Sequence, residues 1–127
     1  MKILVTGGTG YIGSHTVVEL IKAGHEVTII DNLFNSKIEV LDKIATLTGT
    51  KPEFHKLDIL DLNGMRELFQ SHDFEAVIHF AGFKAVAESI EKPLEYYETN
   101  VHGTVNLLKC MAEFKVNKII FSSSATV

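Results

Sequence analysis

The sequence has little cysteine, little proline and no excess of positive charge. Its single cysteine cannot form an intrachain disulfide, so nothing in the 127 residues requires an oxidising compartment. The 16 acidic and 12 basic residues give a net charge of -4 and a pI near 5.8, which argues against binding to nucleic acid or to an anionic membrane surface. The apolar run at residues 1–5 stops at Thr6 and Gly7, too early for a signal peptide or a membrane span. We therefore expect a cytoplasmic protein with neither nucleic acid nor membrane as a partner.

The sequence does contain a regular alternation of short apolar runs and longer stretches with helical spacing, in a chain that is 46% apolar and has the length of one domain. This alternation is typical of βαβ units around a parallel sheet. The predicted strands are residues 2–6, 27–30, 53–57, 76–80 and 118–122. The predicted helices are residues 11–23, 38–47, 64–71 and 94–114, the first two ended by Gly24 and Gly49. Right-handed crossovers then predict an α/β fold with a doubly wound parallel sheet in strand order 3-2-1-4-5.

The first predicted strand runs directly into a glycine-rich loop, Gly7-Gly8-Thr9-Gly10-Tyr11-Ile12-Gly13. Glycines at this spacing allow a turn with positive φ, a close approach of backbone to a diphosphate and tight packing of helix on strand. The helix that opens at Tyr11 offers free N–H groups and the positive end of its dipole. Gly7, Gly10 and Gly13 are therefore predicted to bind the diphosphate of a dinucleotide.

An acidic residue, Asp31, ends the second predicted strand 18 positions after Gly13. A carboxylate there can accept both hydroxyl groups of an adenosine ribose and would repel a 2′-phosphate. Two like charges about 4 Å apart repel by about 4 kcal/mol at an effective dielectric near 20, and Lys37 is the nearest cation in sequence. We therefore predict NAD rather than NADP as the cofactor. The alternative is that Asp31 only caps a loop.

Further motifs follow the glycine loop along the whole chain. They are Asp31-Asn32, Leu57-Asp58-Ile59, His79-Phe80-Ala81-Gly82 and Asn100-Val101-His102-Gly103-Thr104. With them the chain resembles the extended short-chain dehydrogenase/reductase family, whose fold is of the Rossmann type. The segments 83–89, 92–97 and 122–127 narrow the resemblance to those members that interconvert UDP-glucose and UDP-galactose, a reaction of galactose metabolism.

The resemblance implies a set of residues that would contact each part of NAD. Tyr11 and Ile12 lie at the diphosphate, and Asn32, Asn35 and Ser36 join Asp31 around the adenosine ribose. Asp58 and Ile59 border the adenine, while Phe80, Ala81, Gly82, Lys84, Thr99 and Asn100 line the rest of the cofactor cleft. Without the resemblance, Lys84 reads as an ordinary solvated loop lysine.

The resemblance also implies an isomerase that uses bound NAD to take hydride from C4 of the hexose and return it to the opposite face of a 4-keto intermediate. Ser124 is the implied catalytic residue, and Lys84, Ser124, Ala125 and Thr126 are the implied contacts with the UDP-sugar substrate. The family's catalytic Tyr-x-x-x-Lys pair would follow Val127. We therefore expect residues 1–127 to be an incomplete NAD-binding domain that lacks its later strands and the substrate domain and is inactive alone.

Two other functions fit parts of the same pattern. A nucleotide-sugar 4,6-dehydratase or decarboxylase shares the glycine loop and the acid, but related dehydratases place Asp-Glu where this chain has Ala125-Thr126, because elimination needs an acid and a base. A non-catalytic NAD-binding module would share the front of the fold and lack the tyrosine.

The remaining polar and apolar patterns favour structural roles. The six histidines show no His-Glu-x-x-His motif and no close pairing, so no metal is predicted. His79 is expected to be a hydrogen-bonded core residue, and Cys110 a small packed side chain. Along the last predicted helix, Val101, Val105, Leu108, Met111 and Ala112 form a stripe expected to cover the sheet. A second exposed apolar face on this helix would, by the resemblance, pair two full-length copies as a homodimer.

Overall fold

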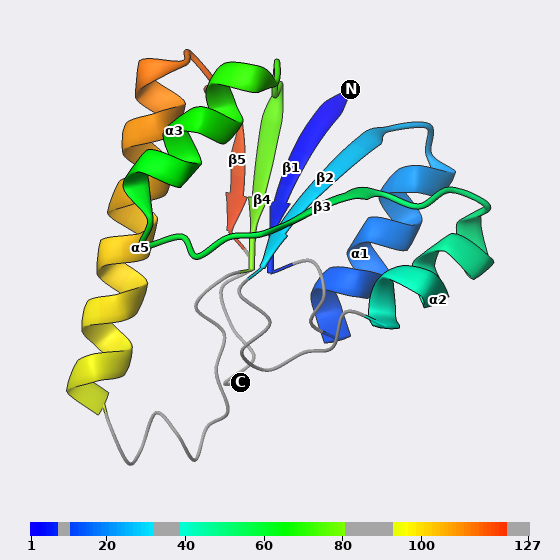
Figure 1. Ribbon diagram of the computed structural model, residues 1–127, viewed down its shortest axis with the longest axis horizontal. Coiled ribbons are helices and arrows are strands. Elements are labelled where there is room, and N and C mark those ends of the chain that lie inside the picture. The colour runs from blue at the N-terminus through cyan, green and yellow to red at the C-terminus, as the bar shows by residue number, and fades with distance from the viewer. Residues whose placement is uncertain (8–10, 32–38, 81–92, 122–127) are drawn as a thin grey trace.

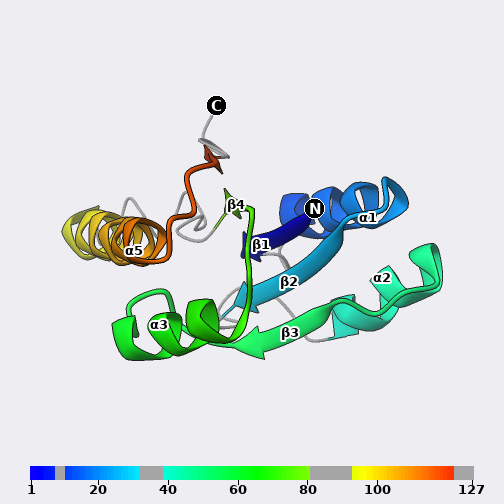
Figure 2. The same cartoon turned by 90° about the horizontal axis from the view of Figure 1, so that it is seen from above.

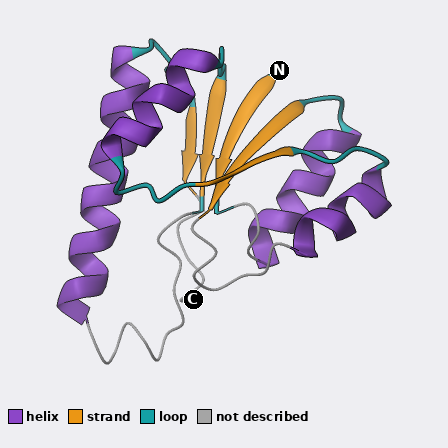
Figure 3. Cartoon of the chain, in the orientation of Figure 1, coloured by secondary structure: helices purple, strands orange, loops and turns teal. Residues whose placement is uncertain are grey.

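A computed structural model describes residues 1–7, 11–31, 39–80 and 93–121, and of residues 11–12 and 93–100 it describes the backbone only. The strands are β1 (Lys2–Thr6), β2 (Glu26–Asp31), β3 (Glu53–Lys56), β4 (Ala76–His79) and β5 (Ile119–Phe121). The helices are α1 (Tyr11–Lys22), α2 (Glu39–Thr48), α3 (Leu62–Ser71) and α5 (Pro93–Glu113). Figure 3 shows that strands and helices alternate along the described chain.

The five strands form one parallel sheet in the order β3-β2-β1-β4-β5, which confirms the predicted fold class and strand order. In the register of the sheet, Thr6 at the end of β1 pairs with Ile30 of β2 and with His79 of β4. The carboxyl ends of these three strands therefore meet at one edge, the lower edge in Figure 1. Ligands of doubly wound sheets bind at this edge.

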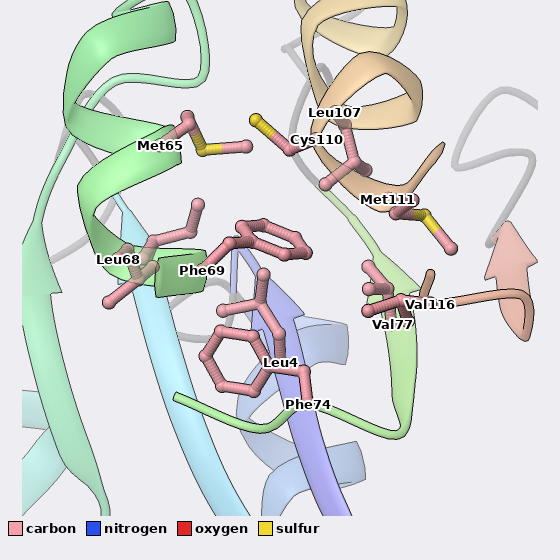
Figure 4. Close-up of a cluster of buried hydrophobic side chains, with 11 residues drawn as sticks. Leu4, Met65, Leu68, Phe69, Phe74, Val77, Leu107, Cys110, Met111 and Val116 are labelled. Atoms are coloured by element: carbon pink, nitrogen blue, oxygen red, sulfur yellow. The ribbon is translucent and has the colours of Figure 1, made fainter. Parts of the chain in front are cut away.

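Helices cover both faces of the sheet, α1 and α2 on one side and α3 and α5 on the other (Figure 2). Alternate residues of each strand face opposite sides, so β1 sends Ile3 and Val5 to the first face and Leu4 to the second. The second face holds the cluster of Figure 4, in which Leu4 and Val77 lie against Phe69 of α3 and Leu107 of α5. Parallel strands buried on both faces explain why the sequence shows continuous apolar runs.

The capping residues explain where the helices end, and they also explain why the third helix begins earlier than predicted. Gly24 and Gly49 follow α1 and α2 with φ of +91° and +75°, the left-handed conformation that glycine adopts without steric cost. The third helix begins at Leu62, two residues before the predicted start at Gly64, because Asp61 is its N-cap and accepts a hydrogen bond from Gly64 N–H at 3.0 Å. Among the described residues, no helix is both long enough and apolar enough to cross a membrane.

The predicted orientation of the last helix is wrong for most of its stripe. Val101, Val105 and Leu108 are exposed, at 42–45% of their accessible surface. Met111 of the predicted stripe does cover the sheet, together with Leu107 and Cys110, which lay outside the stripe. The helix has two apolar stripes, and sequence spacing alone does not say which of them faces the sheet.

Candidate functional site

The turn after β1 has the backbone that the glycine motif predicts. Gly7 has a φ of +76°, and its N–H donates to the Ile30 carbonyl at 2.8 Å, which extends the pairing of β1 with β2 by one residue. Helix α1 begins at Tyr11, so its N-terminus follows within four residues of this turn. Gly13 is buried within the first turn of α1. The chain therefore presents a helix N-terminus close to the carboxyl edge of the sheet, as a diphosphate site requires.

Asp31 ends β2 at the same edge. Its carbonyl oxygen accepts a hydrogen bond from Leu57 N–H at 3.2 Å, and its side chain is half-buried. This bond places the start of the segment 57–61 beside Asp31. The carboxylate, the turn at Gly7 and the segment 57–61 thus lie at the ends of three adjacent strands, β1, β2 and β3.

The segment 57–61 is a turn held by bonds within itself and by α5. Asp58 accepts two of these bonds, from Leu60 N–H on its carboxylate Oδ1 at 2.9 Å and from Asp61 N–H on its carbonyl at 2.9 Å. From α5, the Asn106 side-chain amide donates to the carbonyls of Ile59 and Leu60 at 3.1 and 3.2 Å. These bonds fix the backbone at Asp58 and Ile59, the two residues predicted to border an adenine.

Gly103 lets α5 approach this turn. A Cβ built at Gly103 would lie 2.5 Å from Cγ2 of Ile59, closer than real Cβ atoms come to a neighbouring carbon. Gly103 is otherwise an ordinary helical position, where glycine costs about 1 kcal/mol relative to alanine. The close approach to Ile59 therefore explains the glycine.

A buried chain of hydrogen bonds ties the ends of β1 and β4 to α5. The Thr6 hydroxyl lies 2.6 Å from His79 Nδ1, and the Thr104 hydroxyl lies 3.3 Å from His79 Nε2. Phe80 N–H donates both to the Thr6 carbonyl at 2.8 Å and to its hydroxyl oxygen at 3.1 Å. Both ring nitrogens of His79 therefore face hydroxyl groups, one from β1 and one from α5.

Burial keeps the imidazole of His79 neutral at pH 7. His79 is 7% exposed, and burial lowers its pKa from 6.5 to about 4 because it disfavours the charged form. The ring also packs edge-on against Phe121 at a centroid distance of 5.6 Å. The prediction of a hydrogen-bonded core histidine is confirmed, as is that of a packed Cys110, which is fully buried.

The structure brings together the described members of the predicted site: Gly7, the backbone of Tyr11 and Ile12, Gly13, Asp31, Asp58, Ile59 and Phe80. For Thr99 and Asn100 it gives only their place in α5. The other predicted residues lie outside the described residues: Gly10, Asn32, Asn35, Ser36, Ala81, Gly82, Lys84, Ser124, Ala125 and Thr126.

Sequence reasoning assigned no role to the residues that support this site, Thr6, Gly103, Thr104 and Asn106. A signal was present for two of them. Gly103-Thr104 stands inside a long predicted helix, where an interior glycine indicates a close approach to another segment. Nothing in the sequence marks Thr6 or Asn106 in the same way.

The fold and the residues at its carboxyl edge together define the class of protein. A parallel sheet with a glycine turn and a helix N-terminus after β1, and a carboxylate after β2, is a Rossmann-type fold. The sequence matches the family described as GDP-mannose 4,6 dehydratase over residues 4–127.

Individual proteins with similar sequences and structures identify the family more specifically. The UDP-glucose 4-epimerases of Klebsiella pneumoniae and Yersinia pestis are each 56% identical to this chain over all of its 127 residues. The matched region covers 91% of the Klebsiella relative and 38% of the Yersinia relative. A UDP-glucose-4-epimerase from Stenotrophomonas maltophila, crystallised with bound NAD and formylated UDP-arabinopyranose, has a TM-score of 0.94 and 49% identity over 100% of this chain and 38% of that one. The chain belongs to the UDP-glucose 4-epimerase family. It spans only 35–38% of the length of several curated relatives that it matches.

Proposed function

We propose that residues 1–127 are the NAD-binding portion of an isomerase that interconverts UDP-glucose and UDP-galactose by inverting C4 of the hexose. The observation that carries this proposal is the edge formed by Gly7, the start of α1 and Asp31. Membership of the epimerase family supports the choice of substrate, and the NAD in the Stenotrophomonas relative supports the choice of cofactor. Because the chain covers a minor part of several relatives, its later strands and the substrate domain would belong to a longer polypeptide.

In this proposal the described residues bind and orient the cofactor. The N–H groups at the start of α1 face the diphosphate, and the Asp31 carboxylate accepts the two hydroxyl groups of the adenosine ribose. NAD supplies the hydride chemistry when bound. The turn at Asp58 and Ile59 lies beside Asp31 and would border the adenine, while Phe80 continues the cleft at the end of β4.

The rest of the proposed site comes from the family resemblance. The further cofactor contacts are Gly10, Tyr11, Ile12, Gly13, Asn32, Asn35, Ser36, Ala81, Gly82, Lys84, Thr99 and Asn100. Ser124 would hold the reacting hexose oxygen, with Lys84, Ala125 and Thr126 as further substrate contacts. A Tyr-x-x-x-Lys pair outside these residues would remove the hydroxyl proton.

Calorimetric titration with NAD tests the cofactor site. Asp31→Ala should weaken NAD binding about 10- to 100-fold, since it removes hydrogen bonds to a charged group. Gly10→Val should also weaken it severely, because a side chain there would occupy the diphosphate's place. Asp42→Ala is the matched control, since Asp42 is 78% exposed on α2 and should leave affinity unchanged. Unchanged affinity in both Asp31→Ala and Gly10→Val would overturn the binding mode.

Incubation of the full-length protein with UDP-galactose, without added nucleotide, tests the activity. We expect UDP-glucose to form, because hydride leaves and returns on the same bound cofactor. A 4-keto-6-deoxy product would instead indicate a dehydratase, and absence of any product with NAD demonstrably bound would indicate a non-catalytic binding module.

We propose further that the full-length protein is a homodimer that uses the exposed stripe Val101, Val105 and Leu108 of α5. Three adjacent apolar side chains on one helix face are suited to a self-complementary interface. Sedimentation of the full-length protein should give a dimer, and Val105→Lys should shift it towards monomer. A monomer before substitution would contradict the proposal.

We also propose a cytoplasmic location. Its support is the lone Cys110, which is buried and free. Cell fractionation tests it, and recovery from a secreted fraction would refute it.

A further inference from the structure

Three polar side chains gather where β3 meets the end of α3. His55 Nε2 lies 2.7 Å from Glu53 Oε2, and His72 Nε2 lies 2.5 Å from the same oxygen. One potential ligand atom from each residue lies within 4.8 Å of the others. The histidines are not paired in the sequence, but the fold brings the rings of His55 and His72 to a centroid distance of 5.9 Å.

The fold brings these residues together from two elements. Glu53 and His55 stand two apart on β3, so their side chains leave the same face of this edge strand. His72 is the C-cap of α3, which ends beside β3 in Figure 2. Its ring stacks on Phe74 at a centroid distance of 5.1 Å and an interplanar angle of 8°, which fixes the plane in which Nε2 points at Glu53.

The other ring nitrogen of His72 is held by the end of α3. Nδ1 lies 3.0 Å from the Leu68 carbonyl and 2.9 Å from the Ser71 hydroxyl, which itself donates to the Leu68 carbonyl at 3.0 Å. These contacts orient the ring so that Nε2 faces Glu53 Oε2. A backbone carbonyl on the far nitrogen is also the usual support for a histidine that binds a metal.

Glu53 provides the oxygen donor of the cluster. Its Oε2 faces the Nε2 atoms of both His55 and His72, and its side chain is half-exposed. With two imidazole nitrogens, this is the mixed nitrogen and oxygen donor set that Zn²⁺ accepts, whereas Mg²⁺ and Ca²⁺ prefer oxygen alone.

We propose that Glu53, His55 and His72 form a Zn²⁺ site with three protein ligands and one position open to water. Tetrahedral zinc with bonds of about 2.0–2.1 Å separates its donors by about 3.3 Å. Each histidine nitrogen must therefore move away from Glu53 Oε2 by less than 1 Å, and the ligand atoms of the two histidines, which lie within 4.8 Å of each other, must settle at about the same separation of 3.3 Å. The side chains of Glu53 and His55 are half-exposed and have room for this shift. The ion would join the edge strand β3 to the end of α3, and it would touch no residue of the proposed cofactor site.

Calorimetric titration of the chelator-treated chain with ZnCl₂ in a non-coordinating buffer tests the site. We expect saturable binding of one equivalent and no binding of MgCl₂. His72→Gln should weaken Zn²⁺ binding by about 100-fold or more. Loss of a residue that only supports a metal ligand lowers metal affinity by about 10- to 100-fold, and loss of the ligand itself should lower it further. His102→Gln is the matched control, because His102 is an exposed histidine on α5 and should change nothing.

A spectrum of the unsubstituted chain makes the test independent of how the variants fold. On addition of one equivalent of ZnCl₂, the imidazole ¹⁵N resonances of the Nε2 atoms of His55 and His72 should shift, and those of His102 should not. Absence of saturable binding, full affinity in a folded His72→Gln protein, or shifts confined to other histidines would each overturn the proposal.

Discussion

His79 has a charge state that the fold itself determines. Its folded pKa of about 4 lies below the unfolded value of 6.5, so protonation favours the unfolded chain. The stabilisation is complete above pH 6.5 and is lost progressively as the pH falls through 4. The total loss is about 3 kcal/mol, at 1.36 kcal/mol for each unit of pKa.

Urea unfolding between pH 7 and pH 4 measures this loss. His79→Asn should flatten the pH dependence, because an amide does not titrate. An imidazole resonance of His79 that titrates near pH 6.5 in the folded protein would show that the ring is not held neutral.

Gly103 is predicted to tolerate no side chain while Ile59 is present. Gly103→Ala should cost about 1–3 kcal/mol in the free energy of unfolding, since overpacking against Ile59 exceeds the gain in helix propensity. Combining it with Ile59→Ala should remove most of the added cost. A double-mutant cycle by urea unfolding measures the coupling, and additive effects would mean that the two residues do not meet.

At the scale of the element, α5 offers two adjacent leucines in opposite environments. Leu107 is fully buried and Leu108 is 43% exposed. Leu107→Ala should lower the free energy of unfolding by about 2–5 kcal/mol, and Leu108→Ala should change it by no more than about 0.5 kcal/mol. Equal losses in chemical denaturation would contradict the orientation of the helix.

The positions of the strands and helices along the chain could be predicted from the sequence. Which side of a helix packs on the sheet could not be predicted in every case. Strands buried on both sides appear as apolar runs between glycine turns, which is why β1 was located correctly at Lys2–Thr6. The stripe of α5 was misassigned because Leu107 and Leu108 have the same chemistry. Which of two leucines faces the sheet depends on how the helix packs, and packing does not appear in a one-dimensional pattern.

At the scale of the whole molecule, short sequence motifs predict the residues of the cofactor site but not the residues that support it. Gly7 and Asp31 belong to motifs of short range, and both lie where the strand order predicted. The support formed by Thr6 and His79 joins residues 73 positions apart, and it exists only once β1 and β4 pair in one register. The cluster of Glu53 with His72 depends in the same way on where α3 ends.

Binding of NAD should stabilise the whole fold by mass action. At 100 times its Kd, NAD should add about 2.7 kcal/mol, or roughly 10 °C in Tm for a domain of this size. Scanning calorimetry measures the shift, and NADP at equal concentration should give a smaller one because of Asp31. Equal shifts from the two nucleotides would refute the role of this carboxylate in choosing the cofactor.

The central position of β1 also affects how the protein is made. On the ribosome β2 follows β1 closely, but β4 emerges only after β3 and α3 have been synthesised. Until then one side of β1 has no neighbour, and the unpaired N–H and C=O groups on that side are open to other nascent chains. Slowing translation between α3 and β4 should therefore lengthen the period in which the chain can aggregate, and chaperones would act during that interval.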